Sequence, residues 1–545
     1  MTEQTAPMQP KGTQDIYLRR ASGLTRKISP MDALIFSTIA PGPVTAFMYV
    51  LWAPGLYPGL DMFWGSLALL LFLPIMGLYY LFSISMPRSG GEYVYVSRTL
   101  HPAAGLFANW ALTIAGFSWT GTISAWEVQY GFAPLFWNAG ALNGDKGLMA
   151  LGVNLQNPTW LPGVLLGLVV LAFAEFILWR GAKFSMKVFM IGMVFSLIAL
   201  ATIVIASSSS TPAYFIQRVQ QLNPGVDFQR DIIQAAVNMN VGWVPNKFIL
   251  SATLFGGTAF LMLNMVGNTY TTNIAGEIKN VGKAQPLALF GSVTFFVAWY
   301  FILVGFLYTN PGANFTSAIS ILSDAGSNPL VMTAWPHQEV IYMTTNSTLV
   351  NLSDIGFVVG NFTCLTALSL GPIRNLFAWS FDRLLPEMFA KVDKRGSPYG
   401  ACALASVIAL IMYLLYIYTT YLVFILFTVT LWFCAWIVVG IAGICFPYLK
   451  KTKDIYEKSP SQVKTKIFGV PLICVLGVVT ALISTWVVYA CTVPSLTGLM
   501  SGYELATTVI VLGVCPLILY AVAVLYRTHV SHVNIRLQYT TLPPD

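Results

Sequence analysis

The sequence predicts an all-α polytopic membrane protein with about 12 transmembrane helices. Hydrophobic residues make up 56% of the 545 residues, and charged residues make up only 9%. Soluble domains carry roughly 25% charged residues, so this chain has too few to surround a water-soluble core. The apolar runs are continuous rather than alternating, which excludes a transmembrane β-barrel.

Twelve apolar runs are each long enough to cross the hydrocarbon core, which takes about 20 residues. Two of them, 103–133 and 352–381, are longer than a bilayer requires and therefore predict tilted helices or extensions beyond the membrane. In chain order the expected spans are 31–53, 60–86, 103–133, 161–179, 186–207, 249–276, 286–309, 352–381, 401–420, 421–448, 467–490 and 504–526.

Positive charge is distributed unevenly over the loops between these spans. Twelve spans place both chain ends on one side, and that side carries all but four of the 29 lysines and arginines. An excess of cationic residues marks the cytoplasmic side. The sequence thus predicts a multi-pass protein of the cell (plasma) membrane with cytoplasmic termini. The net charge of +8 then sets orientation among lipids and indicates no nucleic-acid partner. The four cationic residues on the opposite side of the membrane are Lys146, Arg218, Arg230 and Lys247.

The sequence between the spans predicts neither a soluble domain nor a catalytic or metal-binding site. Segments 208–248 and 310–351 are rich in polar residues and are expected outside the cell. Asn314 and Asn346 begin glycosylation-type triplets, which are either acceptors or chance. The seven cysteines fall in or beside expected spans without metal-ligand spacing, so they indicate buried apolar residues. We therefore predict no catalytic residues, no metal site and no cofactor.

The first span contains an unexpected interruption. Its sequence "IFSTIAPGPVTAFMYV" (Ile35–Val50) carries two prolines around a glycine. Proline lacks a backbone N–H and costs about 3 kcal/mol in a helix interior. One interpretation is a kink, which is common in membrane helices. The other is a binding site made of backbone groups.

The sixth span has a matching interruption, and the match favours a binding site. The stretch "NMVGN" (Asn264–Asn268) lies in the middle of this span. Polar groups at that depth are costly unless they face a cavity or a ligand. Breaks in the first helix of each of two five-helix halves, in opposite orientation, predict an inverted repeat. Free N–H groups at such breaks attract a carboxylate, and free carbonyls hold a cation or an ammonium group.

The predicted organisation has seven parts. A cytoplasmic N-terminal tail (1–30) precedes the first five-helix repeat (31–207) and an extracellular loop (208–248). The second five-helix repeat (249–449) is followed by a cytoplasmic loop (450–466), helices 11 and 12 (467–527) and a cytoplasmic C-terminal tail (528–545).

Three loop sequences resemble the signature segments of the amino acid–polyamine–organocation (APC) permeases. The resemblance covers nearly the whole chain, and the segments occur in the family's order on the expected cytoplasmic face. Val281 replaces a proline and Arg383 a glycine that the family usually has. The segments are "PRSGGEYVYVSRTLHPAAG" (Pro87–Gly105), "IAGEIKNVGKAQPLAL" (Ile274–Leu289) and "IRNLFAWSFDRLLPEMFAKVDKRGSPYGA" (Ile373–Ala401).

This resemblance implies a LeuT-like fold, with a 5+5 inverted repeat plus two C-terminal helices. It also implies a secondary active transporter that moves amino acids or related amines by alternating access. An amino acid/amine exchanger is an alternative of the same class. A channel or a membrane-embedded enzyme is less favoured, because the sequence has neither a repeated filter motif nor a catalytic constellation.

The resemblance also places candidate substrate-binding residues in both breaks and in the third span. Two prolines in the first break remove N–H donors that the family's small-residue turn would offer to a carboxylate. Asn109 matches a position that contacts substrate side chains in relatives, although a lone membrane asparagine often bonds helix to helix. The candidates are Thr38, Ile39, Ala40, Pro41, Gly42, Asn109, Asn264, Met265, Val266, Gly267 and Asn268.

Coupling to H⁺ or to Na⁺ is left open by the sequence. Ser196 stands where some relatives carry a lysine in the fifth span, and a serine cannot act as a tethered cation. Thr366 and Ser369 could offer oxygen ligands to sodium, or simply bond to their own helix. Glu127 is an isolated acid near the outer end of the third span. It could relay protons, bind a substrate cation, or simply lie in a solvated outer vestibule.

Overall fold

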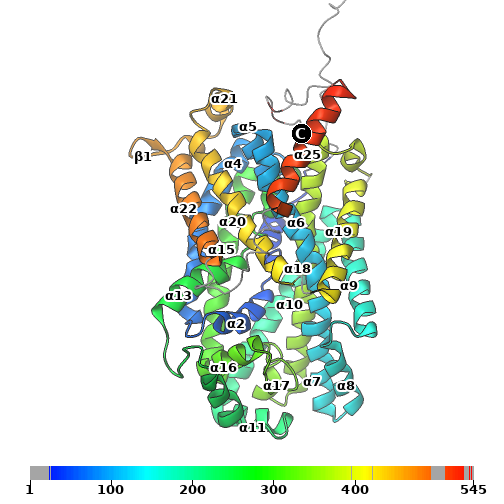
Figure 1. Ribbon diagram of the computed structural model, residues 1–545, viewed down its shortest axis with the longest axis vertical. Helices are drawn as coiled ribbons and strands as arrows, with labels where there is room; N and C mark the ends of the chain where they lie inside the picture. Colours follow the sequence, from blue (N-terminus) through cyan, green and yellow to red (C-terminus); the bar gives the residue numbers. More distant parts are fainter. Residues whose placement is uncertain are drawn as a thin grey trace, which may run out of the picture.

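The computed structural model describes residues 26–393, 396–419, 422–492 and 510–532, with Leu24, Tyr539 and Leu542. Expectations for the N-terminal tail up to Gly23, for 493–509 and for most of the C-terminal tail lie outside these residues. The chain forms a bundle of helices along one long axis (Figure 1). One end carries α5 (Glu92–Thr99) and α21 (Lys450–Lys458), and we call it the motif end; the far end carries α11 (Pro212–Leu222).

Within the described residues, seven helices are long and apolar enough to cross a membrane, or up to eight if a bent pair counts as one span. They confirm a multi-pass helical membrane protein. The number of 12 spans and the inverted repeat stay predictions. The seven are Met62–Ser85, Leu161–Trp179, Ala182–Ser209, Val281–Asp324, Ser347–Phe381, Tyr399–Tyr418 and Leu472–Ala490, and the bent pair is Thr430–Cys445 with Lys450–Lys458.

The remaining elements of the first half match the apolar runs, except that α7, α8, η3 and α12 lie in segments expected to be loops. They are α1 (Pro30–Ile39), α2 (Thr45–Leu56), α3 (Met62–Gly65), η1 (Ser66–Leu71), α4 (Phe72–Ser85), α6 (Pro102–Trp126), η2 (Glu127–Phe132), α7 (Ala133–Asn143), α8 (Lys146–Leu155), α9 (Leu161–Trp179), α10 (Ala182–Ser209), η3 (Phe228–Gln234) and α12 (Ala235–Asn238).

The second half is also helical, apart from one short hairpin of β1 (Lys466–Ile467) and β2 (Val470–Pro471). Its helices are α13 (Leu250–Gly256), η4 (Gly257–Leu261), α14 (Tyr270–Asn273), η5 (Ala275–Glu277), α15 (Val281–Leu307), η6 (Tyr308–Gly312), α16 (Ala313–Asp324), α17 (Val340–Met343), α18 (Ser347–Phe381), η7 (Glu387–Ala390), α19 (Tyr399–Tyr418), α20 (Leu422–Cys445), η8 (Ser461–Lys464), α22 (Leu472–Thr492), η9 (Ile510–Val514) and α25 (Cys515–His529).

Both predicted interruptions are confirmed. The first span divides into α1, which ends at Ile39, and α2, which begins at Thr45. The sixth span leaves helical geometry after Leu263 and resumes at α14. Each turn contains a glycine with a positive φ, +81° at Gly42 and +107° at Gly267. Such angles are costly for residues that carry a Cβ, so glycine permits both turns.

The three loop segments that resemble permease signatures meet at the motif end. Arg98 of α5 pairs with Asp382, which follows α18, at 2.6 Å. Glu277 of η5 pairs with Arg374 of α18 at 2.5 Å. Buried ion pairs need close partners because desolvation of each charge is expensive. The segments therefore hold the motif end together and do not line the bundle centre.

Candidate functional site

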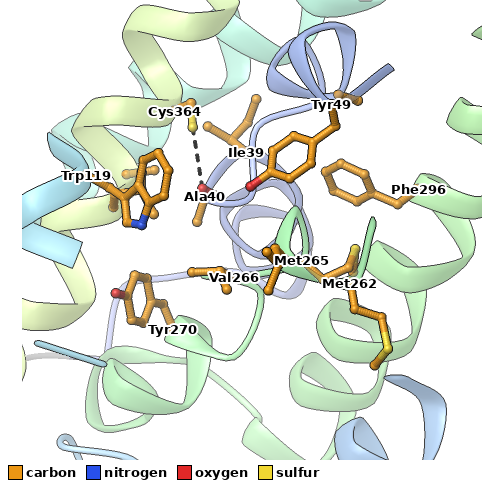
Figure 2. Close-up of a cluster of buried hydrophobic side chains, with 14 of the residues drawn as sticks. Ile39, Ala40, Tyr49, Trp119, Met262, Met265, Val266, Tyr270, Phe296 and Cys364 are labelled. Carbon is orange, nitrogen blue, oxygen red and sulfur yellow. Dashed lines mark hydrogen bonds between the residues drawn. The ribbon is translucent and has the colours of Figure 1, made fainter. Parts of the chain in front are cut away.

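A small cavity lies where the two broken helices meet. Its lining comes from α2, α6, α18 and both breaks, and it is mostly apolar and aromatic. In Figure 2, Trp119 and Tyr49 approach Ala40 from opposite sides, with Val266 and Tyr270 below them. The lining residues are Ala40, Pro41, Thr45, Tyr49, Trp119, Ile123, Trp126, Leu263, Asn264, Val266, Cys364 and Leu368.

Asn264 ties the two breaks to each other. Its Nδ2 donates to the Pro41 carbonyl at 3.1 Å and to the Thr45 hydroxyl at 2.9 Å. Its Oδ1 accepts a hydrogen bond from the Tyr300 hydroxyl of α15 at 2.9 Å. One side chain thus joins three membrane helices, and this explains why an amide is stable at this depth.

Backbone groups in the breaks remain available for a ligand. The N–H groups of Gly42 and Gly267 have no hydrogen-bond partner among the described residues. The Ala40 carbonyl accepts only a long contact from the Cys364 thiol, at 3.5 Å. Unpaired donors suit a carboxylate, and an almost free carbonyl suits an ammonium group.

Aromatic rings cover one side of the cavity. Trp126 packs edge-on against Trp119 at 5.3 Å and against Trp52 at 5.1 Å between ring centroids. The Trp335 ring packs against Trp52 and Tyr130, with ring centroids 5.8 Å and 4.6 Å apart, respectively. Such edge-to-face and tilted arrangements are the preferred geometries of aromatic pairs. The rings form a continuous apolar cover contributed by segments far apart in the chain.

The predicted substrate-binding residues fall into three groups. Four of them line the cavity, six lie in the two breaks or in the last turn of α1 without lining it, and Asn109 lies elsewhere. Asn109 donates to Glu92 of α5, and its Oδ1 accepts from the Trp379 indole N–H at 2.6 Å. The four lining residues are Ala40, Pro41, Asn264 and Val266, and the six neighbours are Thr38, Ile39, Gly42, Met265, Gly267 and Asn268.

Several lining residues were missed by sequence reasoning. Thr45 and Tyr49 follow the first break at helical spacing, which is the signal that could have found them. Cys364 and Leu368 of α18 repeat the same four-residue spacing on one face. Nothing in the local sequence indicates that this face, rather than another, turns toward the breaks.

The three hydroxyl groups that were candidate sodium ligands form hydrogen bonds with different partners. Ser196 donates to the Gly192 carbonyl at 2.8 Å, and Thr366 donates to the Phe362 carbonyl at 2.9 Å, both within their own helices. Ser369 pairs with Thr120 of α6 at 2.8 Å. Ser196 and Thr366 are thus satisfied within their own helices, as serine and threonine commonly are, whereas Ser369 bonds across to α6.

Glu127 is buried, with 1% of its surface exposed. Its Oε2 accepts a hydrogen bond from Asn361 Nδ2 of α18 at 2.6 Å. Its Oε1 has no hydrogen-bond partner among the described residues. The carboxylate therefore faces α18 and is not at a solvated surface.

Apolar helices long enough to cross a membrane, with two broken spans around an internal cavity, define a multi-pass integral membrane protein. A family model described as "Amino acid permease" matches residues 31–515. The chain belongs to the amino acid permease family.

Individual relatives are distant. An uncharacterized amino-acid permease of Schizosaccharomyces pombe is 25% identical over 340 residues, which is 61% of this chain and 55% of that protein. A branched-chain amino acid permease of Lactococcus lactis is 23% identical over 343 residues, 61% of this chain and 63% of that protein. A Bacillus subtilis protein of the same description is 26% identical over 160 residues, 29% of this chain and 31% of its own. The chain thus covers less than two thirds of each of these relatives.

Proposed function

We propose that this protein is a secondary active transporter of neutral amino acids with apolar side chains, working by alternating access. The observation that carries the proposal is the cavity between two broken helices. The Ala40 carbonyl lies in its lining, the N–H groups of Gly42 and Gly267 belong to residues next to lining residues, and most of the lining is apolar. An amino acid presents the complementary surface, two charges at one end and a side chain at the other.

The two charged groups of the substrate are assigned to the two breaks. The N–H groups of Gly42 and Gly267 donate to the carboxylate, and the Ala40 carbonyl accepts from the ammonium group. These roles replace the N–H donors that Pro41 and Pro43 cannot supply. Helix ends at a break also carry partial charges of the required sign.

The side-chain subsite favours an apolar group. None of the described lining residues is charged, so a second ammonium or a guanidinium group would be buried without a partner, which is costly. Two relatives are described as branched-chain amino acid permeases, which agrees with this preference. We therefore favour leucine, isoleucine, valine and phenylalanine over amines and cationic amino acids.

The motif end is assigned to the cytoplasm, because the loops there carry most of the cationic residues. An ion gradient, H⁺ or Na⁺, drives accumulation. The scattered bonding of Ser196, Thr366 and Ser369 favours H⁺, since sodium requires several oxygen ligands around one point. An amino acid exchanger, which needs no coupled ion, is the second candidate.

Counterflow in proteoliposomes tests this proposal. Labelled L-leucine should enter vesicles preloaded with leucine, and isoleucine, valine and phenylalanine should compete, whereas arginine and putrescine should not. Replacing sodium by choline at constant pH should leave uptake unchanged, and an acid-outside pH gradient should drive accumulation. Absence of counterflow for every amino acid, or a preference for putrescine, would refute the proposal. Counterflow without accumulation under any ion gradient would favour the exchanger.

A further inference from the structure

A buried carboxylate at the motif end is not used by the transport site. Glu92 begins α5, in the loop between the expected spans 60–86 and 103–133, and its exposed fraction is 0%. Its Oε1 accepts hydrogen bonds from Asn109 Nδ2 of α6 and, at 3.3 Å, from Asn273 Nδ2 of α14. Oε2 has no hydrogen-bond partner, and no described residue forms an ion pair with Glu92.

The cluster around Glu92 contains buried polar atoms without a hydrogen-bond partner, among them the Tyr79 hydroxyl that faces the carboxylate. Asn273 Oδ1 is buried and also without a partner. Asn273 Nδ2 additionally donates to Asn375 Oδ1 at 2.5 Å, and Asn375 Nδ2 donates to the Thr113 hydroxyl at 2.9 Å. Buried acceptors without donors are expensive. A proton on Glu92 would add a second donor beside the Tyr79 hydroxyl and would remove the uncompensated charge.

The same residues form the contact between α5 and the segment that follows the sixth-span break. The Gly90 N–H donates to the Asn273 carbonyl at 2.9 Å. A Cβ on Gly91 would lie 2.9 Å from the Thr272 hydroxyl, so this close approach requires glycine. Separation of α5 from α14 would therefore admit water to Glu92.

Among the residues that the structure describes, the titratable groups that face Glu92 are tyrosines. These are Tyr79 of α4, Tyr95 of α5 and Tyr270 of α14, and none offers a positive charge. Burial raises the pKa of Glu92 from 4.5 to about 7, against the opposing effect of hydrogen bonds that include those from Asn109 and Asn273. An acid whose pKa is raised in the closed arrangement stabilises that arrangement at low pH. The stabilisation is lost as pH rises toward 7, because the carboxylate is better solvated in water.

We propose that Glu92 is a proton-binding residue of the motif-end gate. It carries a proton while α5 and α14 are in contact and gives it to water on that side when they separate. The only bond broken is the carboxyl O–H, and the proton leaves as hydronium. The inference rests on the proposed function, because a transporter must open this end, and it identifies the coupled ion as H⁺.

Hydrogen–deuterium exchange of α5 and α14 amides tests the inference without a substrate. Opening of the contact, corrected for the intrinsic pH dependence of exchange, should be about tenfold more frequent at pH 8 than at pH 6 in the wild type, as expected when the closed pKa is about 7 and the open pKa about 4.5. Glu92→Gln cannot ionise and should show no change with pH. Equal pH dependence in Glu92→Gln and the wild type would overturn the inference.

Two further variants keep the test decisive. Asn273→Ala removes a donor to the carboxylate, so the midpoint of the pH dependence should move to higher pH. An unchanged midpoint would overturn the inference even if Glu92→Gln failed to fold. Glu175→Gln is the matched control, because Glu175 is a buried acid whose Oε2 accepts from Ser406 Oγ at 2.8 Å, and it should keep the wild-type profile.

Leucine transport by the same proteins separates this inference from the proposed function. Wild-type protein without counterflow would refute leucine transport, and hydrogen exchange would still decide the role of Glu92. If the wild type transports leucine, Glu92→Gln should keep counterflow and lose accumulation driven by a pH gradient. Undiminished proton-driven accumulation in Glu92→Gln would refute the inference alone.

Discussion

At the scale of single residues, Asn264 shows how one polar side chain can organise a membrane site. Its amide satisfies three partners on two other helices, Pro41, Thr45 and Tyr300. A polar group in the sixth-span break was expected to face a ligand. The structure shows that its hydrogen bonds hold the two breaks in position, and its side chain also borders the cavity.

Replacement of Asn264 by Leu should abolish leucine counterflow and lower stability. The change keeps a similar volume but leaves the Tyr300 hydroxyl buried without its acceptor, which costs about 1–3 kcal/mol. Thermal unfolding in detergent and counterflow would measure both effects. Tyr300→Phe is the control, because it removes one bond and leaves the tie to Pro41, so most counterflow should survive. Full transport by Asn264→Leu would show that the tie is dispensable.

At the scale of elements, the breaks depend on glycines as much as on prolines. Gly42 and Gly267 adopt positive φ, and an added Cβ on either would meet the opposite break or its neighbours. On Gly267 it would lie 3.1 Å from the Ala40 carbonyl carbon. The two broken helices therefore approach each other through their turns, and the cavity exists because these turns are compact.

Gly267→Ala should remove transport while the protein still inserts in the membrane. Gly312 is a matched control, since its φ of +104° is close to the +107° of Gly267 but nothing lies within 4 Å of its added Cβ. Both substitutions carry the backbone strain of a positive φ, about 1–3 kcal/mol. Only Gly267→Ala also disturbs the contact with Ala40. Equal counterflow in the two variants would contradict the close approach of the breaks.

At the scale of the whole molecule, the three signature segments and the cavity are separate. The three permease-like segments meet at the motif end, where Arg98–Asp382 and Glu277–Arg374 are buried. The cavity lies at the breaks and draws only on membrane helices. The residues that carry the family resemblance are therefore not the residues that line the cavity.

Glu277→Gln should destabilise the protein strongly. The change leaves the buried Arg374 without the carboxylate it pairs with, and breaking a buried pair costs about 3–5 kcal/mol. The double variant Glu277→Gln with Arg374→Met removes both charges and should recover most of the lost stability. Denaturation in detergent would measure this series. A double variant as unstable as the single one would show that the pair has another role.

Much of the architecture was predictable because its causes are local. Composition and run length predicted a multi-pass helical membrane protein, and proline and glycine located both breaks. These features are local in the sequence, extending over one or two helical turns, so they can be recognised without knowing which other helix packs against the segment. The predicted Ala40, Pro41, Asn264 and Val266 line the cavity for the same reason.

The remaining features were decided by tertiary structure. Asn109 contacts Glu92 and Trp379 instead of the cavity, and Cys364 reaches the Ala40 carbonyl from a position 324 residues away. Nearly every face of a membrane helix is apolar, so periodicity does not indicate which face meets which neighbour. The sequence by itself determined where the helices run and break. Only the packing of the helices decided which polar side chains form hydrogen bonds with one another. A polar side chain buried away from water needs a hydrogen-bond partner within the protein, and for these side chains that partner lies on another helix.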